Sequence, residues 1–319
     1  MYILCHTGYS LDNSVKWRYG MLRFLLLWIG GGLWCLSSLV LRPKRLSSDR
    51  LYQLEAKTGK FNELQYKNIK KYKFNIMSDY GYNLSCELLE PPCLSNSKKV
   101  KKIAVLCHGF SQGKYRSLIY AEIFLGMGFD VLIYDHRNHG LSGRAYTSMG
   151  YYEKYDLKKL VDWCYSTYGS DCKLVTHGES MGAATALLHL GIDERVTCSI
   201  ADCAYSDLYD LLRHQAKHYY HLPHFFIPLE SLITYIRAGF WYGDVSPIKV
   251  ISKVDTPVLF IHGKKDDYVP TVMSKQMYRC KKGKKALYLV AGAEHAKSCL
   301  VNRLGYEEKL QSFIDKYIS

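Results

Sequence analysis

A serine suited to act as a nucleophile lies within residues 178–182, which read GESMG. The apolar run 172–177 precedes it and an Ala- and Leu-rich segment follows, so the pattern predicts a strand, a sharp turn and a helix meeting at Ser180. Small glycines fit on both sides because the turn is strained and the chain packs tightly around the exposed hydroxyl. The G-x-S-x-G pattern is typical of a nucleophile elbow, although five residues alone are weak grounds for a function.

A base and an acid follow Ser180 in the order that such an elbow requires. A hydroxyl is a poor nucleophile near neutral pH until a neighbouring base takes its proton. His295 comes just after the last expected strand and is predicted to be that base. Asp266 and Asp267 follow the strand before it, where a carboxylate would orient the imidazole and stabilise its protonated form. Position alone leaves both aspartates open.

The oxyanion that forms during acyl transfer needs preorganised N–H donors. Met181 supplies one because it directly follows the nucleophile. The second is expected from residues 108–111, which read HGFS after an apolar run, and the backbone N–H of Phe110 is the predicted donor. His108 is expected to be a structural residue that hydrogen-bonds within this loop.

Short apolar runs predict the sheet that must position these residues. They lie at 103–107, 131–134, 174–176, 196–201, 258–262 and 287–290. Such runs are typical of strands that helices bury on both faces of a parallel sheet. The helices are expected at 115–127, 152–168, 181–191 and 306–317. Residues 72–90 alternate between apolar and polar and predict an antiparallel hairpin at the sheet edge.

A long connection interrupts this alternation at about residues 205–250 and is rich in aromatic side chains. Its length predicts a mostly helical cap over the site. Four histidines in it have spacings that could gather a metal on a helix face, at positions His214, His218, His221 and His224. No acidic or cysteine ligand lies nearby and Pro223 interrupts the helix, so histidines on the cap surface are the default interpretation.

The N-terminal segment 24–41 reads FLLLWIGGGLWCLSSLVL, eighteen residues without a charge. That length just spans a bilayer core and predicts a single transmembrane helix. A cleaved signal peptide is the alternative, but no A-x-A-like site is present. More positive charge follows the segment than precedes it, which favours a cytoplasmic catalytic domain. The expected organisation is a tail over 1–23, the anchor over 24–41, a stalk over 42–65 and the catalytic domain over 66–319.

Charge and cysteine content restrict the class of protein further. Forty-three Lys and Arg against 29 Asp and Glu leave a net charge of +14, but no nucleic-acid motif accompanies them. The basic runs are interpreted as solvated residues, with attraction to an anionic membrane surface as the alternative. Eleven cysteines, several within apolar stretches, favour buried free thiols, although a bridge between Cys164 and Cys172 stays open.

Four segments together resemble the α/β-hydrolase superfamily, in the branch of monoacylglycerol lipases, lysophospholipases and serine aminopeptidase-like proteins. They are residues 108–111, 135–142, 177–184 and 262–270. The resemblance runs from about Gln65 to the C-terminus and extends to membrane-anchored bacterial hydrolases. The last segment is similar to the family's H-G-x-x-D-x-x-V-P, which selects Asp266. Asn138 replaces the glycine of the family's D-x-R-G-H-G-x-S.

The resemblance implies a mostly parallel eight-stranded sheet with helices on both faces and a helical cap. It implies a membrane-anchored serine hydrolase that uses Ser180, His295 and Asp266 through an acyl-enzyme, most often a carboxylesterase or lipase acting on acyl esters or lysophospholipids. A serine peptidase acting on short peptides is the alternative. A non-catalytic scaffold would have lost a triad residue, and none is lost. No cofactor, nucleic acid or obligate protein partner is implied, because no phosphate-binding or dinucleotide motif is present.

Overall fold

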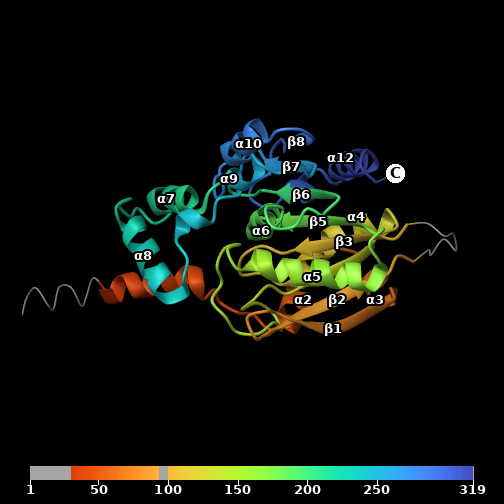
Figure 1. The fold of residues 1–319 in the computed structure, drawn as a ribbon, viewed down its shortest axis with the longest axis horizontal. Coiled ribbons are helices and arrows are strands. Elements are labelled where there is room, and N and C mark those ends of the chain that lie inside the picture. Colours follow the sequence, from red (N-terminus) through yellow and green to blue (C-terminus); the bar gives the residue numbers. More distant parts are fainter. Residues whose placement is uncertain (1–29, 93–99, 319) are drawn as a thin grey trace, which may run out of the picture.

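Eight strands form one sheet in this computed structural model, which describes residues 30–92 and 100–318 (Figure 1). Their order across the sheet is β1-β2-β4-β3-β5-β6-β7-β8. β1 and β2 form an antiparallel hairpin at the edge, and the ladders from β3 onward are parallel, so the predicted hairpin and parallel sheet are confirmed. The strands are β1 (Lys71–Met77), β2 (Asn83–Leu89), β3 (Lys102–Cys107), β4 (Asp130–Tyr134), β5 (Lys173–Glu179), β6 (Cys198–Asp202), β7 (Val258–Gly263) and β8 (Lys285–Val290).

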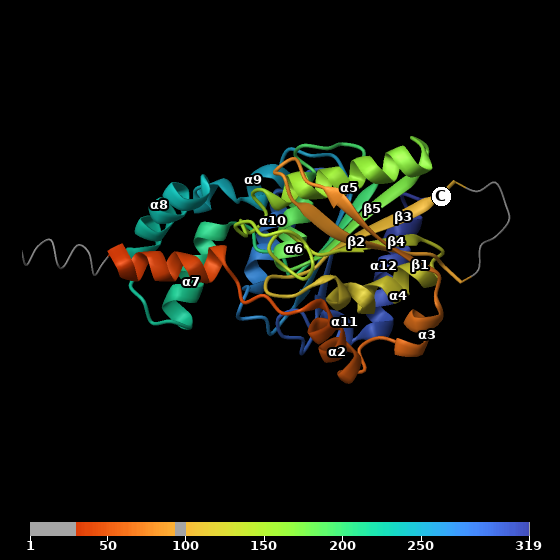
Figure 2. The ribbon, with the colours of Figure 1, turned by 90° about the horizontal axis from the view of Figure 1, so that it is seen from below.

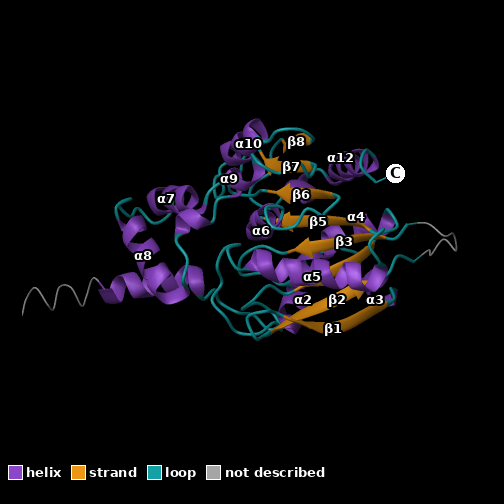
Figure 3. Cartoon of the chain, viewed as in Figure 1, coloured by secondary structure: helices purple, strands orange, loops and turns teal. Residues whose placement is uncertain are grey.

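Helices cover both faces of the sheet because successive strand side chains point to opposite sides (Figure 3). In β3, Ala104 and Leu106 belong to one buried cluster, whereas Ile103 and Val105 belong to the other. The first cluster includes α4 and α12, and the second includes α5, α6 and α10. Strands buried on both faces explain why their sequences are continuous apolar runs.

The described helices include the four predicted at 115–127, 152–168, 181–191 and 306–317, each of which begins and ends within three residues of the prediction. They are α2 (Ser48–Lys57), α3 (Glu63–Asn68), α4 (Leu118–Gly126), α5 (Glu153–Tyr168), α6 (Met181–His189), α7 (Leu208–His218), α8 (Phe226–Ala238), α9 (Pro247–Ile251), α10 (Thr271–Cys280), α11 (Ser298–Val301) and α12 (Arg303–Asp315), with short 3-10 turns at Lys114–Ser117 and Tyr242–Asp244. α7, α8 and α9 fill the connection between β6 and β7, and α7 and α8 stand beyond one end of the sheet (Figure 1).

A helix over residues 30–41 packs against the cap, beside α8 (Figure 2). The Arg237 guanidinium of α8 donates to the Trp34 carbonyl at 2.7 Å and to the Ser38 hydroxyl at 2.9 Å, and lies over the Trp34 ring. At the end of the helix, Leu41 is fully buried and its carbonyl accepts a hydrogen bond from the Thr147 N–H.

The predicted membrane span falls partly on this helix. Residues 1–23 and 24–29 lie outside the described residues. Within the described ranges 30–92 and 100–318, no helix has the length and apolar character needed to cross a bilayer.

The segment 42–65, predicted as a stalk, contains α2 and the start of α3, and both contact the core around the sheet. Tyr52, Phe61, Tyr66 and Tyr115 form a cluster of rings whose centroids lie 5.3 to 6.2 Å apart. Aromatic pairs at such separations stabilise beyond the area that they bury. The segment is therefore packed against α4 and the turn before it.

All cysteines in the described part of the chain are free thiols, including the Cys164 and Cys172 pair that the sequence left open. Burial raises the pKa of Cys107 and of Cys198 to about 12. These side chains therefore act as small apolar groups in the core.

Replacing Leu41 tests whether the N-terminal helix is part of the folded core. Leu41→Ala is expected to lower the free energy of unfolding by about 2–5 kcal/mol, because it removes a fully buried side chain and leaves a cavity. Leu39→Ala, at a residue that is 59% exposed, is expected to change it by less than about 0.5 kcal/mol. Urea denaturation of the full chain measures both, and equal losses would contradict the packing described here.

Candidate active site

Ser180 occupies a strained turn between β5 and α6. Its φ of 55° and ψ of −115° lie outside the regions that residues with a side chain prefer. A Cβ added to Gly178 would meet the backbone of Gly182, and one added to Gly182 would meet the carbonyl of Cys107 in β3. Only glycine permits these two close approaches, so the local sequence dictates how the serine is presented at the end of β5.

The structure brings Ser180, His295 and Asp266 together. The His295 Nε2 lies 3.0 Å from the Ser180 Oγ, and the His295 Nδ1 lies 2.8 Å from the Asp266 Oδ2. These distances allow Ser180 to donate its hydroxyl proton to the imidazole, while the imidazole donates its own N–H to the carboxylate. The residues come from three separate loops at the carboxyl ends of β5, β7 and β8.

Asp266, and not its neighbour Asp267, faces the imidazole. Burial acts to raise the pKa of the Asp266 carboxyl, but hydrogen bonds with His262 and His295 outweigh it, so the pKa lies below its ordinary value. The carboxylate also accepts the Val269 N–H at 2.9 Å. Asp267 is exposed, and its carbonyl contacts His214 at 2.7 Å. An ionised Asp266 can therefore stabilise a positive charge on the imidazole.

The two predicted oxyanion donors, Phe110 and Met181, lie near Ser180. Met181 begins α6 directly after Ser180, and Phe110 follows β3 and lines the same pocket as Ser180. Among the residues that the structure describes, no hydrogen-bond acceptor is found for the backbone N–H of Phe110 or Met181. Two free donors near a nucleophile are suited to an oxyanion.

Comparisons with known proteins show the family to which the chain belongs. A sequence profile described as serine aminopeptidase, S33, matches residues 98–204. The chain is 36% identical to the uncharacterized protein YqkD of Bacillus subtilis over 282 residues. The aligned region covers 88% of this chain and 90% of that protein. This chain belongs to the α/β-hydrolase superfamily. The uncharacterized protein Rv2307c of Mycobacterium tuberculosis is a more distant relative, 25% identical over 60% of this chain and 62% of its own length.

Solved structures share the fold of this α/β hydrolase. The esterase Pf2001 of Pyrococcus furiosus superposes with a TM-score of 0.68 at 20% identity, over 88% of this chain and 100% of that one. The acylaminoacyl peptidase of Pyrococcus horikoshii superposes with a TM-score of 0.61 at 16% identity, over 81% of this chain and 43% of its own. At these identities the likeness concerns the fold alone.

A buried ion pair, which the sequence did not reveal, connects the nucleophile with the base. Arg116 donates to both carboxylate oxygens of Glu179, at 3.1 and 2.9 Å, and to the carbonyl of Ala296 at 2.9 Å. Tyr120 donates to the same carboxylate. Burial acts to raise the pKa of Glu179, but Arg116 and Tyr120 outweigh it and the pKa is lowered. One guanidinium therefore fixes the residue before Ser180 and the residue after His295.

The loop after β4 hydrogen-bonds to the loop that follows β3. Burial lowers the pKa of His108 to about 3, and this neutral ring accepts the His136 N–H at 2.9 Å. His108 is thus a structural residue in its loop, as the sequence predicted. Asn138, which replaces a family glycine, has a φ of 61°. Asparagine tolerates this left-handed region better than most residues, which explains the replacement.

An apolar pocket lies over Ser180. The cap supplies one wall through residues such as Leu211 and Ile227, and the N-terminal helix supplies another through Leu36, Leu39 and Val40. The carboxylate of Glu230 is the only acidic group among the described residues that line it. Both of its oxygens are buried without a hydrogen-bond partner, and burial raises its pKa to about 7.

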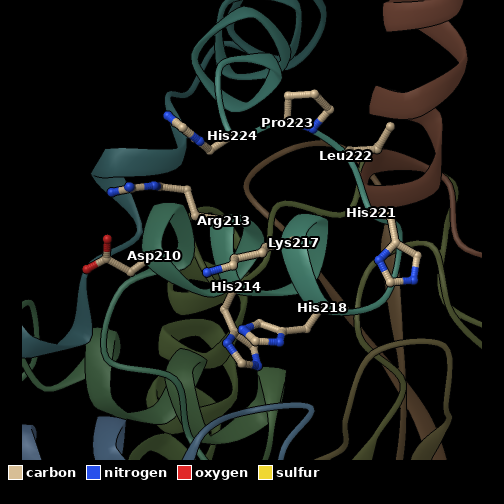
Figure 4. A pocket seen from close by; sticks show the side chains of 9 residues that line it. All are labelled: Asp210, Arg213, His214, Lys217, His218, His221, Leu222, Pro223 and His224. Carbon is tan, nitrogen blue, oxygen red and sulfur yellow. The ribbon is translucent and has the colours of Figure 1, made fainter.

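The four cap histidines do not converge as a metal site would require. The rings of His214 and His218 lie with centroids 4.4 Å apart and tilted by 34°, whereas His221 and His224 come from the connection to α8 (Figure 4). Within the described residues, the only group of three potential ligand atoms is Cys203, Asp266 and His295. Burial raises the pKa of Cys203 well above its ordinary value, and a protonated thiol is a poor ligand.

The Arg116–Glu179 pair can be tested by removing its charges one after the other. Arg116→Leu is expected to lower the free energy of unfolding by about 3–5 kcal/mol, because it leaves a buried carboxylate without its cation. Adding Glu179→Gln should recover much of the loss, since it removes that charge. Urea denaturation measures both, with Arg279→Leu on the exposed face of α10 as the control. A double variant no more stable than Arg116→Leu would contradict this account.

Proposed function

We propose that this α/β hydrolase is a serine esterase that cleaves carboxylic esters with apolar acyl chains at a membrane. The observation that carries the proposal is the hydrogen-bonded series from Ser180 through His295 to Asp266. Its position beneath an apolar pocket supports an acyl substrate, because such a pocket binds hydrocarbon by the hydrophobic effect.

The chemistry follows from the positions of the donors and acceptors. The Ser180 oxygen attacks the ester carbonyl while the His295 Nε2 takes its proton. The negative oxygen of the tetrahedral intermediate accepts hydrogen bonds from the N–H groups of Phe110 and Met181. His295 then gives its proton to the departing alkoxide, and an acyl-serine remains. Water, activated by the same imidazole, hydrolyses the acyl-enzyme and frees Ser180.

Membrane association is the second part of the proposal. Residues 24–29 are apolar in sequence and directly precede the helix 30–41, three of whose side chains line the pocket over Ser180. An anchor at this point would hold the pocket close to lipid. This arrangement supports acyl esters or lysophospholipids as the substrate class.

A serine peptidase is the second candidate, and Glu230 is the observation that favours it. A carboxylate inside the pocket could bind the amino terminus of a peptide. Of the other acidic residues in the cap, Asp207 caps α7, Asp244 accepts the Trp241 N–H, and Asp210 lines a separate hollow. A single carboxylate in an apolar pocket supports the ester function more than the peptidase function.

Adjacent aspartates provide a matched test of the proposed triad. Asp266→Asn is expected to lower kcat for p-nitrophenyl esters by about 10⁴-fold, because the imidazole loses the carboxylate that orients it. Asp267→Asn should leave kcat within about twofold, since this side chain is exposed and does not contact His295. Ser180→Ala should abolish both turnover and labelling by a fluorophosphonate. Equal effects of the two asparagine variants would refute the assignment of Asp266.

Paired substrates distinguish the ester function from the peptidase function. The wild type is expected to hydrolyse p-nitrophenyl esters and to leave amino-acyl anilides uncleaved. Glu230→Gln should change ester turnover by less than about tenfold, because the amide keeps the shape and removes only the charge. Rapid anilide cleavage that Glu230→Gln abolishes would establish the peptidase function instead.

A further inference from the structure

A hollow with a strong excess of cationic side chains lies on the outside of the cap. α7 and the connection to α8 line it with Arg213, Lys217, His214, His218, His221, His224, Leu222, Pro223 and Asp210. Figure 4 shows Arg213 and Lys217 extending in the same direction from successive turns of α7. Asp210 is the only acidic side chain in the set. The hollow therefore offers several donors and one opposing charge.

The two permanent cations of the hollow, Arg213 and Lys217, have no carboxylate partner among the described residues, although Arg213 lies over the Tyr209 ring at 6.0 Å. No ion pair is found for Arg213 or Lys217 within residues 30–92 and 100–318. Arg116 and Arg195, by contrast, each bind carboxylates. The carbonyl end of the α7 dipole attracts Lys217, but this attraction does not extend to Arg213 one turn earlier. A cation pair left unneutralised in a concave site is suited to an external anion.

The hollow adjoins an apolar surface and the substrate pocket. Leu222 lines both the hollow and the pocket over Ser180. The connection then leads into α8. Phe225, directly before this helix, and Ile236, within it, are both exposed. α8 in turn packs beside the helix 30–41, where Trp34 is exposed. Cations beside exposed aromatic and aliphatic groups are typical of surfaces that bind anionic bilayers.

We propose that this hollow binds the phosphate group of an anionic phospholipid when the cap rests on a bilayer. The proposal rests on the membrane-associated function above and adds a lipid-binding site distinct from the substrate pocket. The chain supports this occupant because the helix 30–41, which the apolar residues 24–29 precede in sequence, lies next to α8 at the same end of the molecule. Arg213 and Lys217 would supply the charge, and His224, which lies on the same side of the hollow in Figure 4, would supply a hydrogen bond.

Hydrogen exchange of the full chain on vesicles tests the proposal. Amides of residues 219–225 are expected to exchange at least about threefold more slowly on vesicles with about 30% phosphatidylglycerol than on phosphatidylcholine vesicles. Arg213→Gln combined with Lys217→Gln should remove this difference. Lys309→Gln combined with Lys316→Gln removes the same charge from α12 and from the residue that directly follows it, away from the cap, and should preserve the difference.

The exchange measurements on the two double variants can overturn the proposal of a lipid-binding site. A difference that survives Arg213→Gln/Lys217→Gln, or that both double variants lose equally, would overturn the proposal. The same exchange is also measured with inorganic phosphate and no vesicles. If phosphate alone slows exchange of residues 219–225 as much as the anionic vesicles do, the site binds free phosphate and not lipid. Turnover of a water-soluble p-nitrophenyl ester is measured on the same proteins. It should stay unchanged in all of them, so failure of the esterase function is distinguishable from failure of lipid binding.

Discussion

The contact between the turn at Ser180 and strand β3 is the constraint on which the site depends. The backbone of Gly182 passes so close to the Cys107 carbonyl that a methyl group would not fit, and Gly178 packs equally closely against the start of α6. This contact forces α6 to cross β3 and leaves Ser180 in a conformation that its own side chain disfavours. The adjacent loop from β3 brings Phe110 to the same place. The proposed nucleophile and oxyanion donors are therefore positioned by one backbone crossing, and the later strands carry the proposed acid and base.

Features that depend on local pattern could be predicted from the sequence, and features that depend on distant contacts could not. Buried strands are continuous apolar runs whatever their neighbours, which is why β3 to β8 were found close to their observed positions. The choice of Asp266 came from a short segment around a single strand end. Arg116, however, lies 63 residues before Glu179, and nothing near either residue signals their pairing.

Long-range packing also explains why the segment 42–65 is folded onto the core and does not form an unattached stalk. The polar composition of residues 42–65 suggested a stalk, but a few aromatic side chains, Tyr52 and Phe61 among them, are enough to fix α2 on the core. Their partner Tyr115 comes from the turn before α4, far along the chain. The histidines of the cap show the opposite case. Their spacing suggested convergence, whereas the connection after α7 turns away and separates His221 and His224 from the helix.

The helix over residues 30–41 has a practical consequence for biochemistry. Because Leu36, Leu39 and Val40 line the pocket over Ser180, that pocket is complete only when the helix 30–41 is present. A shortened protein beginning at residue 42 would lack these three side chains and would expose the interior of the cap to water. Chain-length preferences measured on such a fragment would describe an artificially widened cleft, not the selectivity of the intact enzyme.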